Sequence, residues 1–144
     1  MDHVAIMKKS WGLTEKILNG EKTVESRWYK FKYPPWGRIK VGDEIYFKDS
    51  GEPVTIKAHV VRVLEFDNLT LEKTEYLLSK YGRADLGTSN IMPEIRKYVV
   101  GKKYAIFIFF DDIKKIKPFN IDKAGFGTMS SWISINDISK IKMK

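Results

Sequence analysis

The sequence contains no cysteine. A chain without thiols can form no disulfide and no thiolate metal site, and it has no cysteine nucleophile. Histidine is scarce as well: His3 and His59 are far apart, and neither has a neighbouring carboxylate at the spacing of a metal site. We therefore expect neither a metal nor a cofactor, and the absence of cysteine fits the reducing cytoplasm.

Long apolar runs are also missing. No run approaches the roughly 20 residues that span a bilayer, and the N-terminus lacks the basic start and apolar core of a signal peptide. We expect a soluble cytoplasmic protein with no membrane partner. The length of 144 residues is typical of one domain, so the prediction is a single monomeric domain over residues 1–144.

What the chain has in excess is positive charge. The net charge is +8, and residues 101–144 supply +5 of it through nine lysines against four aspartates. A polyanion such as RNA would suit this surface, although a biased genome or a thermophile's solvated surface gives the same composition. Four tryptophans add flat rings on which bases could stack, but most rings of a small domain belong to its core.

Apolar spacing predicts helices over residues 13–20, 69–81 and 93–100, with caps at Thr14 and Thr70 and stops at Gly20, Gly82 and Gly101. Strands are predicted over 2–8, 22–28, 44–47, 54–66 and 103–113, the third and fourth forming a hairpin. The run 103–113 is continuously apolar, which indicates a strand buried on both faces near the centre of the sheet. Pro34 and Pro35 mark residues 30–37 as a loop.

One short motif carries a family resemblance. After Trp11 and a predicted helix come Gly20, Lys22 and Arg27 in the pattern Gly-x-Lys-x-x-x-x-Arg, and Val41–Ile45 then opens a hairpin. This arrangement resembles the ASCH family. The resemblance implies an α+β fold, a PUA-like β-barrel of about five to seven mixed strands with two to four flanking helices. It also implies a ligand: RNA, or a nucleotide or nucleoside that carries a modified base.

The motif has a physical interpretation of its own. A helix that ends at Gly20 delivers Lys22 and Arg27 onto one short segment, where their donors could converge on a phosphate or a base carbonyl while Glu25 orients them. Strict strand alternation would point Lys22 and Arg27 to opposite faces, so they share a pocket only if the strand starts irregularly. The alternative is an exposed ion cluster on a surface strand, which would contribute little.

Some ASCH proteins are small bacterial N4-acetylcytidine amidohydrolases, and the resemblance implies a catalytic Lys, a Thr three residues later and a distant Glu. The Lys is Lys22, but the Thr position is Glu25 here. The distant Glu would be Glu72 or Glu75. A hydrolase acting on an acylated (deoxy)nucleoside or on RNA would then use Lys22 and Glu25 as its catalytic pair, or take a hydroxyl from Thr23 or Ser26.

Related EVE and YTH domains bind modified bases between aromatic rings, which suggests tryptophans as walls of a basic, aromatic cleft. The leading hypothesis is an RNA- or nucleoside-binding domain, the hydrolase is the alternative, and an interaction domain with a basic face for a protein or ribonucleoprotein partner is the third reading. The predicted binding residues are Trp11, Lys22, Arg27, Trp28, Trp36 and Trp132.

Overall fold

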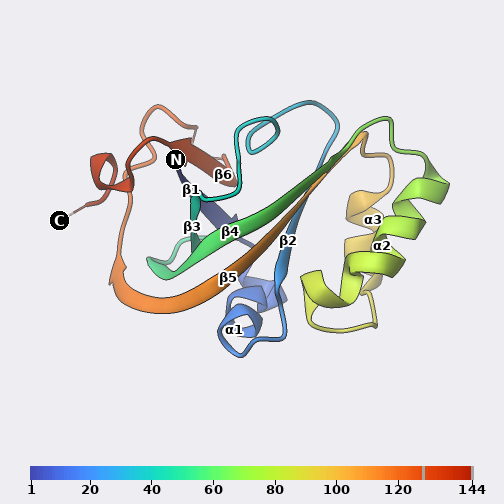
Figure 1. Cartoon of the computed structure of the whole chain (residues 1–144), viewed down its shortest axis with the longest axis horizontal. Coiled ribbons are helices and arrows are strands. Elements are labelled where there is room, and N and C mark those ends of the chain that lie inside the picture. Colours follow the sequence, from blue (N-terminus) through green and yellow to red (C-terminus); the bar gives the residue numbers. More distant parts are fainter. Residues whose placement is uncertain (128, 144) are drawn as a thin grey trace.

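The computed structural model describes residues 1–127 and 129–143, and its centre is one mixed sheet of six strands in the order β2-β5-β4-β3-β1-β6 (Figure 1). β1 and β3 are parallel, and the other neighbouring pairs are antiparallel. The strands are β1 (Asp2–Met7), β2 (Val24–Tyr29), β3 (Glu44–Asp49), β4 (Val54–Phe66), β5 (Tyr104–Phe119) and β6 (Trp132–Ile135).

Three α-helices and two short 3₁₀ helices accompany the sheet in this part of the chain: α1 (Leu13–Leu18), α2 (Leu71–Leu86), α3 (Pro93–Val99), η1 (Lys9–Trp11) and η2 (Ile138–Lys140). α2 and α3 lie together at one end of the sheet (Figure 1), where Leu77, Leu78 and Val99 share a buried cluster with Phe107 of β5. The sheet is curled into a half-barrel. The predicted α+β class, with a PUA-like barrel, is therefore confirmed.

The apolar half of β5 is buried on both faces, as predicted. Ile106, Ile108 and Phe110 join the largest core cluster, whereas Ala105 and Phe107 face the cluster under α2 and α3. β5 nevertheless lies one strand from the edge of the sheet. It also continues past the predicted end at 113 to Phe119, because β4 pairs with it as far as Val54. The register of this pair shifts at three places, each a β-bulge or a similar irregularity, and such features bend long strands.

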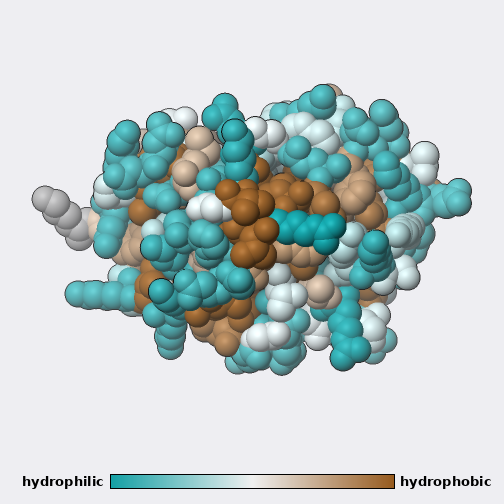
Figure 2. All heavy atoms as spheres, viewed as in Figure 1, coloured by the Kyte–Doolittle hydropathy of each residue, from teal (hydrophilic) through white to brown (hydrophobic). Residues whose placement is uncertain are grey.

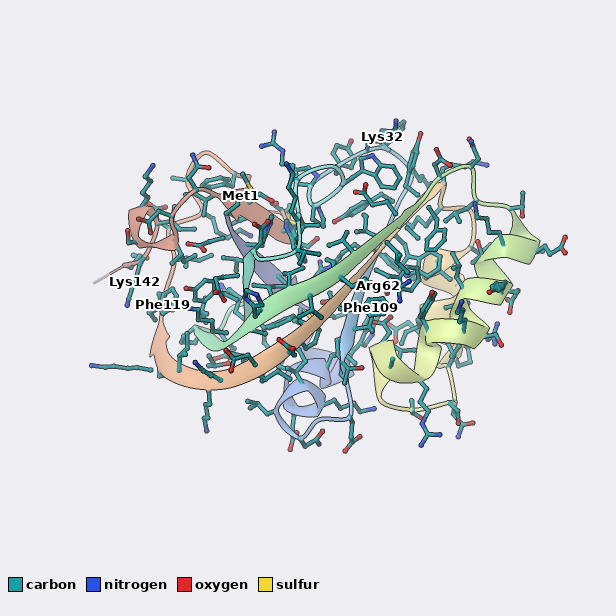
Figure 3. All side chains as sticks on the ribbon, in the orientation of Figure 1. Met1, Lys32, Arg62, Phe109, Phe119 and Lys142 are labelled. Atoms are coloured by element: carbon teal, nitrogen blue, oxygen red, sulfur yellow. The ribbon has the colours of Figure 1, made fainter. Side chains whose placement is uncertain are left out.

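Two aromatic rings on this long strand are covered by cations (Figure 3): Arg62 lies over Phe109 with its Cζ 5.2 Å from the ring centroid, and Lys142 lies over Phe119 at 4.7 Å. Polar and charged side chains dominate the face seen in Figure 2, with an apolar patch near its middle.

The predicted end of α2 was wrong. The helix runs through Gly82 and stops only at Gly87, which has a left-handed φ of 71°. Gly82 serves packing instead, since a Cβ there would lie 3.2 Å from Cδ1 of Ile91. The predicted start was correct: Oγ1 of Thr70 accepts a hydrogen bond from the Lys73 amide at 3.1 Å.

α1 presents the site segment. Gly20 adopts the predicted left-handed conformation, with φ of 82°, directly after the helix. Thr14 does not cap this helix: the N-cap is Gly12, and the Thr14 hydroxyl donates instead to the carboxylate of Asp49, 3.1 Å away. No helix in the described ranges has both the length and the apolar character needed to cross a membrane.

Candidate functional site

Lys22 is completely buried, with 0% of its surface exposed. Its Nζ donates to the carbonyl oxygens of Val24 and Asp85 and to Oδ1 of Asp85, each 2.6 Å away. Oε1 of Glu25 lies 3.2 Å from the same nitrogen. An ammonium has three donors, and these partners use them all. Lys22 therefore holds the site together from within and has no donor left for a ligand.

The start of β2 is irregular, which is the condition under which Lys22 and Arg27 could belong to one site. The amide of Lys22 donates to Lys16 of α1 and that of Thr23 donates to Ala84 of α2, so these two residues link the helices and the strand begins at Val24. Lys22 and Ser26 therefore both contact the carboxylate of Asp85, and Lys22 also contacts Glu25. The surface ion cluster considered above is excluded, because Lys22 and Glu25 are both buried.

Asp85 is the residue that sequence reasoning missed. Its Oδ2 accepts from the Ser26 hydroxyl and its Oδ1 from the Ser26 amide. The carboxylates expected from this helix lie elsewhere: Glu72 is in its exposed first turn, and Glu75 pairs with Arg96 at 2.7 Å on the surface. A prediction that ends α2 before Gly82 leaves Asp85 outside the helix, which is why its position next to Lys22 was not foreseen.

Glu25 is buried and pairs with the half-buried Arg27, with Oε2 of Glu25 3.2 Å from Nη2 of Arg27. Burial raises the pKa of the Glu25 carboxyl, but the charges of Lys22 and Arg27 and their hydrogen bonds outweigh it, so the pKa lies below its ordinary value. Glu25 is thus ionised at neutral pH. With Asp85 included, two cations and two anions balance in this buried cluster.

Arg27 also joins opposite edges of the curled sheet. Its Nη1 donates to the carbonyl of Ser131 at 3.1 Å, just before β6, and its Nη2 donates to the carbonyl of Ile6 in β1 at 3.3 Å. The guanidinium lies over the ring of Trp132. β2 and β6 are the two edge strands, so Arg27 spans the open seam of the half-barrel.

A cleft of about 360 Å³ opens at this seam, and we call it the seam cleft. The ends of β1 and β2, the Trp11 region, Tyr98 of α3 and residues 129–131 surround it. The rings of Trp11 and Tyr98 meet edge to face with centroids 6.2 Å apart. The lining residues are Ile6, Met7, Lys8, Trp11, Leu13, Glu25, Ser26, Arg27, Trp28, Ser50, Tyr98, Lys123, Met129, Ser130 and Ser131.

The structure brings four of the predicted site residues to this cleft, namely Trp11, Glu25, Arg27 and Trp28. Trp28 is 4% exposed and belongs largely to the core. Trp132, equally buried, lines a neighbouring cavity instead. Trp36 lines neither cavity and packs edge to face on Tyr104. Over residues 1–127 and 129–143, no group of three or more His, Asp or Glu is placed to hold a metal ion.

Comparison with known proteins gives a clear result for the fold. No protein-family model matches the sequence, and no curated protein matches it significantly. Crystal structures of ZmASCH from Zymomonas mobilis are similar: a Tyr-to-Phe mutant has a TM-score of 0.69 at 20% identity, over 96% of this chain and 93% of that chain. A Ser-to-Ala mutant also has a TM-score of 0.69 at 20% identity, over 96% of this chain and 91% of that chain.

A further structure, of ASCH from the same organism, has a TM-score of 0.66 at 19% identity and covers 99% of this chain and 96% of that chain. Similarity at this identity shows the fold. The chain therefore has the fold of ASCH domain proteins over nearly its whole length, and the resemblance inferred from Gly20, Lys22 and Arg27 is confirmed at that level.

Proposed function

We propose that the seam cleft binds a nucleobase, either in a nucleoside or within RNA. The observation that carries this proposal is the pair of Glu25 and Arg27, a carboxylate and a guanidinium side by side in a cleft that is also lined by aromatic rings. A carboxylate accepts from the amino group of a base, and a guanidinium donates to a carbonyl or ring nitrogen. The pair thus complements a base edge that carries both kinds of group.

Stacking would supply the remaining affinity. Trp11 and Tyr98 stand against the cleft, and an aromatic ring stacked on a base contributes about 1–3 kcal/mol. Lys123 adds positive charge around the same cleft, which favours a phosphate-bearing ligand, whereas Lys8 is paired with Glu94 at 2.7 Å. Lys22 has no direct part in this recognition. It keeps Glu25 ionised and in position from below, since its Nζ is 3.2 Å from that carboxylate.

Calorimetric titration of the protein with cytidine, adenosine, guanosine and uridine tests the proposal. The amino-bearing bases should bind more tightly than uridine, which offers no amino group to Glu25. Glu25→Gln should weaken their binding about fivefold, because a hydrogen bond to a charged acceptor is worth roughly 1 kcal/mol more than a neutral one. Glu75→Gln, the same change on the surface, is the control. Equal affinity of wild type and Glu25→Gln for every base would refute the assignment.

A second candidate is hydrolysis of an acylated nucleoside or of RNA, and Ser26 is the observation that favours it. Its hydroxyl lines the cleft and donates to Asp85, whose other oxygen accepts from Lys22. A hydroxyl bonded to a carboxylate is the arrangement of an activated nucleophile. Ionised Glu25 could instead act as a general base toward water, which is the role left to it where the amidohydrolases carry Thr.

Turnover assays separate the two functions. The purified protein is incubated with a panel of acylated nucleosides and with RNA, and the products are followed by chromatography. Ser26→Ala should abolish turnover if Ser26 is the nucleophile, whereas loss in Glu25→Gln with an active Ser26→Ala would assign the base role to Glu25. Wild-type protein that binds these ligands and leaves them intact would be a binding domain.

A further inference from the structure

A second and larger cavity, of about 600 Å³, lies next to the seam cleft. The loop between β2 and β3 forms one side of it with Tyr33, Pro34 and Arg38, and Gly125, Phe126 and residues 129–134 form the other. We call it the loop cleft. Met129, Ser130 and Ser131 line both cavities. The stacked side chains of Arg27 and Trp132 stand between them, since Arg27 lines the seam cleft and Trp132 lines the loop cleft.

The cation in the loop cleft is uncommitted. Arg38 is exposed, and its guanidinium makes no hydrogen bond or ion pair with any residue in the described ranges. Arg27 differs in this respect, because Glu25, Ile6 and Ser131 already hold it. A free guanidinium presents its planar fork of donors to solvent, which suits the oxygens of a phosphate.

An aromatic ring accompanies this cation. Tyr33 is 56% exposed, yet its ring is held edge to face against Tyr29, with centroids 6.1 Å apart. The Tyr29 hydroxyl in turn donates to the carbonyl of Pro34 at 3.0 Å, which ties the loop to β2. A ring that is exposed but fixed in place loses little entropy when a base stacks on it.

We propose that the loop cleft is a second nucleotide site. The ligand is then single-stranded RNA of at least two nucleotides, with one base in the seam cleft, the next on Tyr33 and phosphate on Arg38. This inference rests on the function proposed for the seam cleft and deepens it, because it selects an RNA strand over a free nucleoside. The three residues common to both cavities make the path continuous, and the ligand is complementary in charge to Arg38.

The test compares one ligand series across matched variants. A nucleoside, the corresponding dinucleotide and a seven-nucleotide RNA are titrated into wild type, Tyr33→Ala, Arg38→Gln and Glu25→Gln. Lys40→Gln is the control for charge, since Lys40 is exposed on the same loop and lines neither cleft. Tyr76→Ala is the control for an exposed ring. Thermal unfolding establishes that each variant is folded.

Wild type should bind the dinucleotide at least tenfold more tightly than the nucleoside. Tyr33→Ala should lose about tenfold on the two RNA ligands and nothing on the nucleoside. Arg38→Gln should lower the log–log salt slope for RNA by about 0.7, the value of one single-strand phosphate contact. Both control variants should bind as wild type does, and Glu25→Gln should weaken every ligand.

Three outcomes would overturn the second site: RNA that binds no more tightly than the nucleoside, Tyr33→Ala and Arg38→Gln that bind RNA as wild type does, or a polyglutamate peptide that competes as well as RNA. In each of these cases a selective loss in Glu25→Gln would leave the seam cleft standing. Failure of the proposed function has a different signature, because no nucleoside would then bind and Glu25→Gln would change nothing.

Discussion

The guanidinium of Arg27 lies over the indole ring of Trp132, with its Cζ 5.1 Å from the ring centroid. These residues belong to β2 and β6, the two edges of the sheet. The indole is fixed in turn, since its Nε1 is 3.2 Å from the Ser134 hydroxyl and 3.3 Å from Nδ1 of His3. One cation thus closes the seam of the half-barrel and separates its two clefts.

Arg27→Lys should lower the free energy of unfolding by about 2 kcal/mol. Lysine keeps the charge, but it lacks the planar fork that reaches Glu25, Ile6 and Ser131 together, and a buried charge with fewer partners is costly. Urea denaturation measures the effect. Arg96→Lys is the matched control, because its pair with Glu75 is exposed and should contribute little. Equal losses in both variants would argue against the bridging role.

Lys22→Met should destabilise the protein more than Arg27→Lys does, with a loss of about 3–5 kcal/mol in the free energy of unfolding. The two buried carboxylates of Glu25 and Asp85 would lose the cation that they share. The denaturation midpoint in urea reports it. Lys9→Met removes an exposed ion pair with Glu52 and should leave that midpoint almost unchanged. A stable Lys22→Met protein would mean that Glu25 and Asp85 do not depend on the ammonium.

His3 makes stability depend on pH. Burial lowers the pKa of its imidazole below the ordinary 6.5, and the hydrogen bond and charge of Asp43 oppose this only in part. Just below pH 6.5 the imidazole of His3 binds a proton in the unfolded chain but stays neutral in the folded chain. Stability should therefore fall as pH falls from 6.5, by at most about 1.4 kcal/mol per pH unit. Denaturation measured between pH 5.5 and 7.5 tests this, because carboxylates ordinarily titrate below that range.

Two further readouts isolate His3. The imidazole resonance of His3 in an NMR titration should move at a pH below 6.5, and His3→Gln should flatten the acid side of the stability profile. His59→Gln, which removes a surface histidine with its side chain 41% exposed, is the matched control. An unchanged acid-side loss in His3→Gln would assign the dependence to another group.

Gly87→Ala should destabilise the protein more than Gly101→Ala does. Both glycines have left-handed backbones, with φ of 71° and 83°, so an added side chain costs about 1 kcal/mol at either position. At Gly87 the new Cβ would also lie 2.8 Å from Cδ of Lys16 and 3.2 Å from Cβ of Glu21, whereas nothing lies within 4 Å at Gly101. Parallel melting curves of the two variants give the difference.

Local patterns were enough for most of the secondary structure. Gly20 ends the first helix, Thr70 caps α2, and the apolar run of β5 reads as a doubly buried strand, because each depends on neighbours a few residues away. Gly82 shows where such reasoning fails. A glycine that stops a helix and a glycine that leaves room for the side chain of Ile91 look alike in sequence. Only the neighbour that packs against the glycine distinguishes them.

The sequence by itself determined the fold class and singled out the segment from Gly20 to Arg27. Only the tertiary structure decided which charges meet. Lys22 is satisfied by Asp85, 63 residues further along the chain, and Arg27 finds its partners across a seam that exists only once the sheet has curled. A buried ion needs partners on every side. Most of these partners come from segments that are distant in the sequence, and a local sequence pattern does not show them.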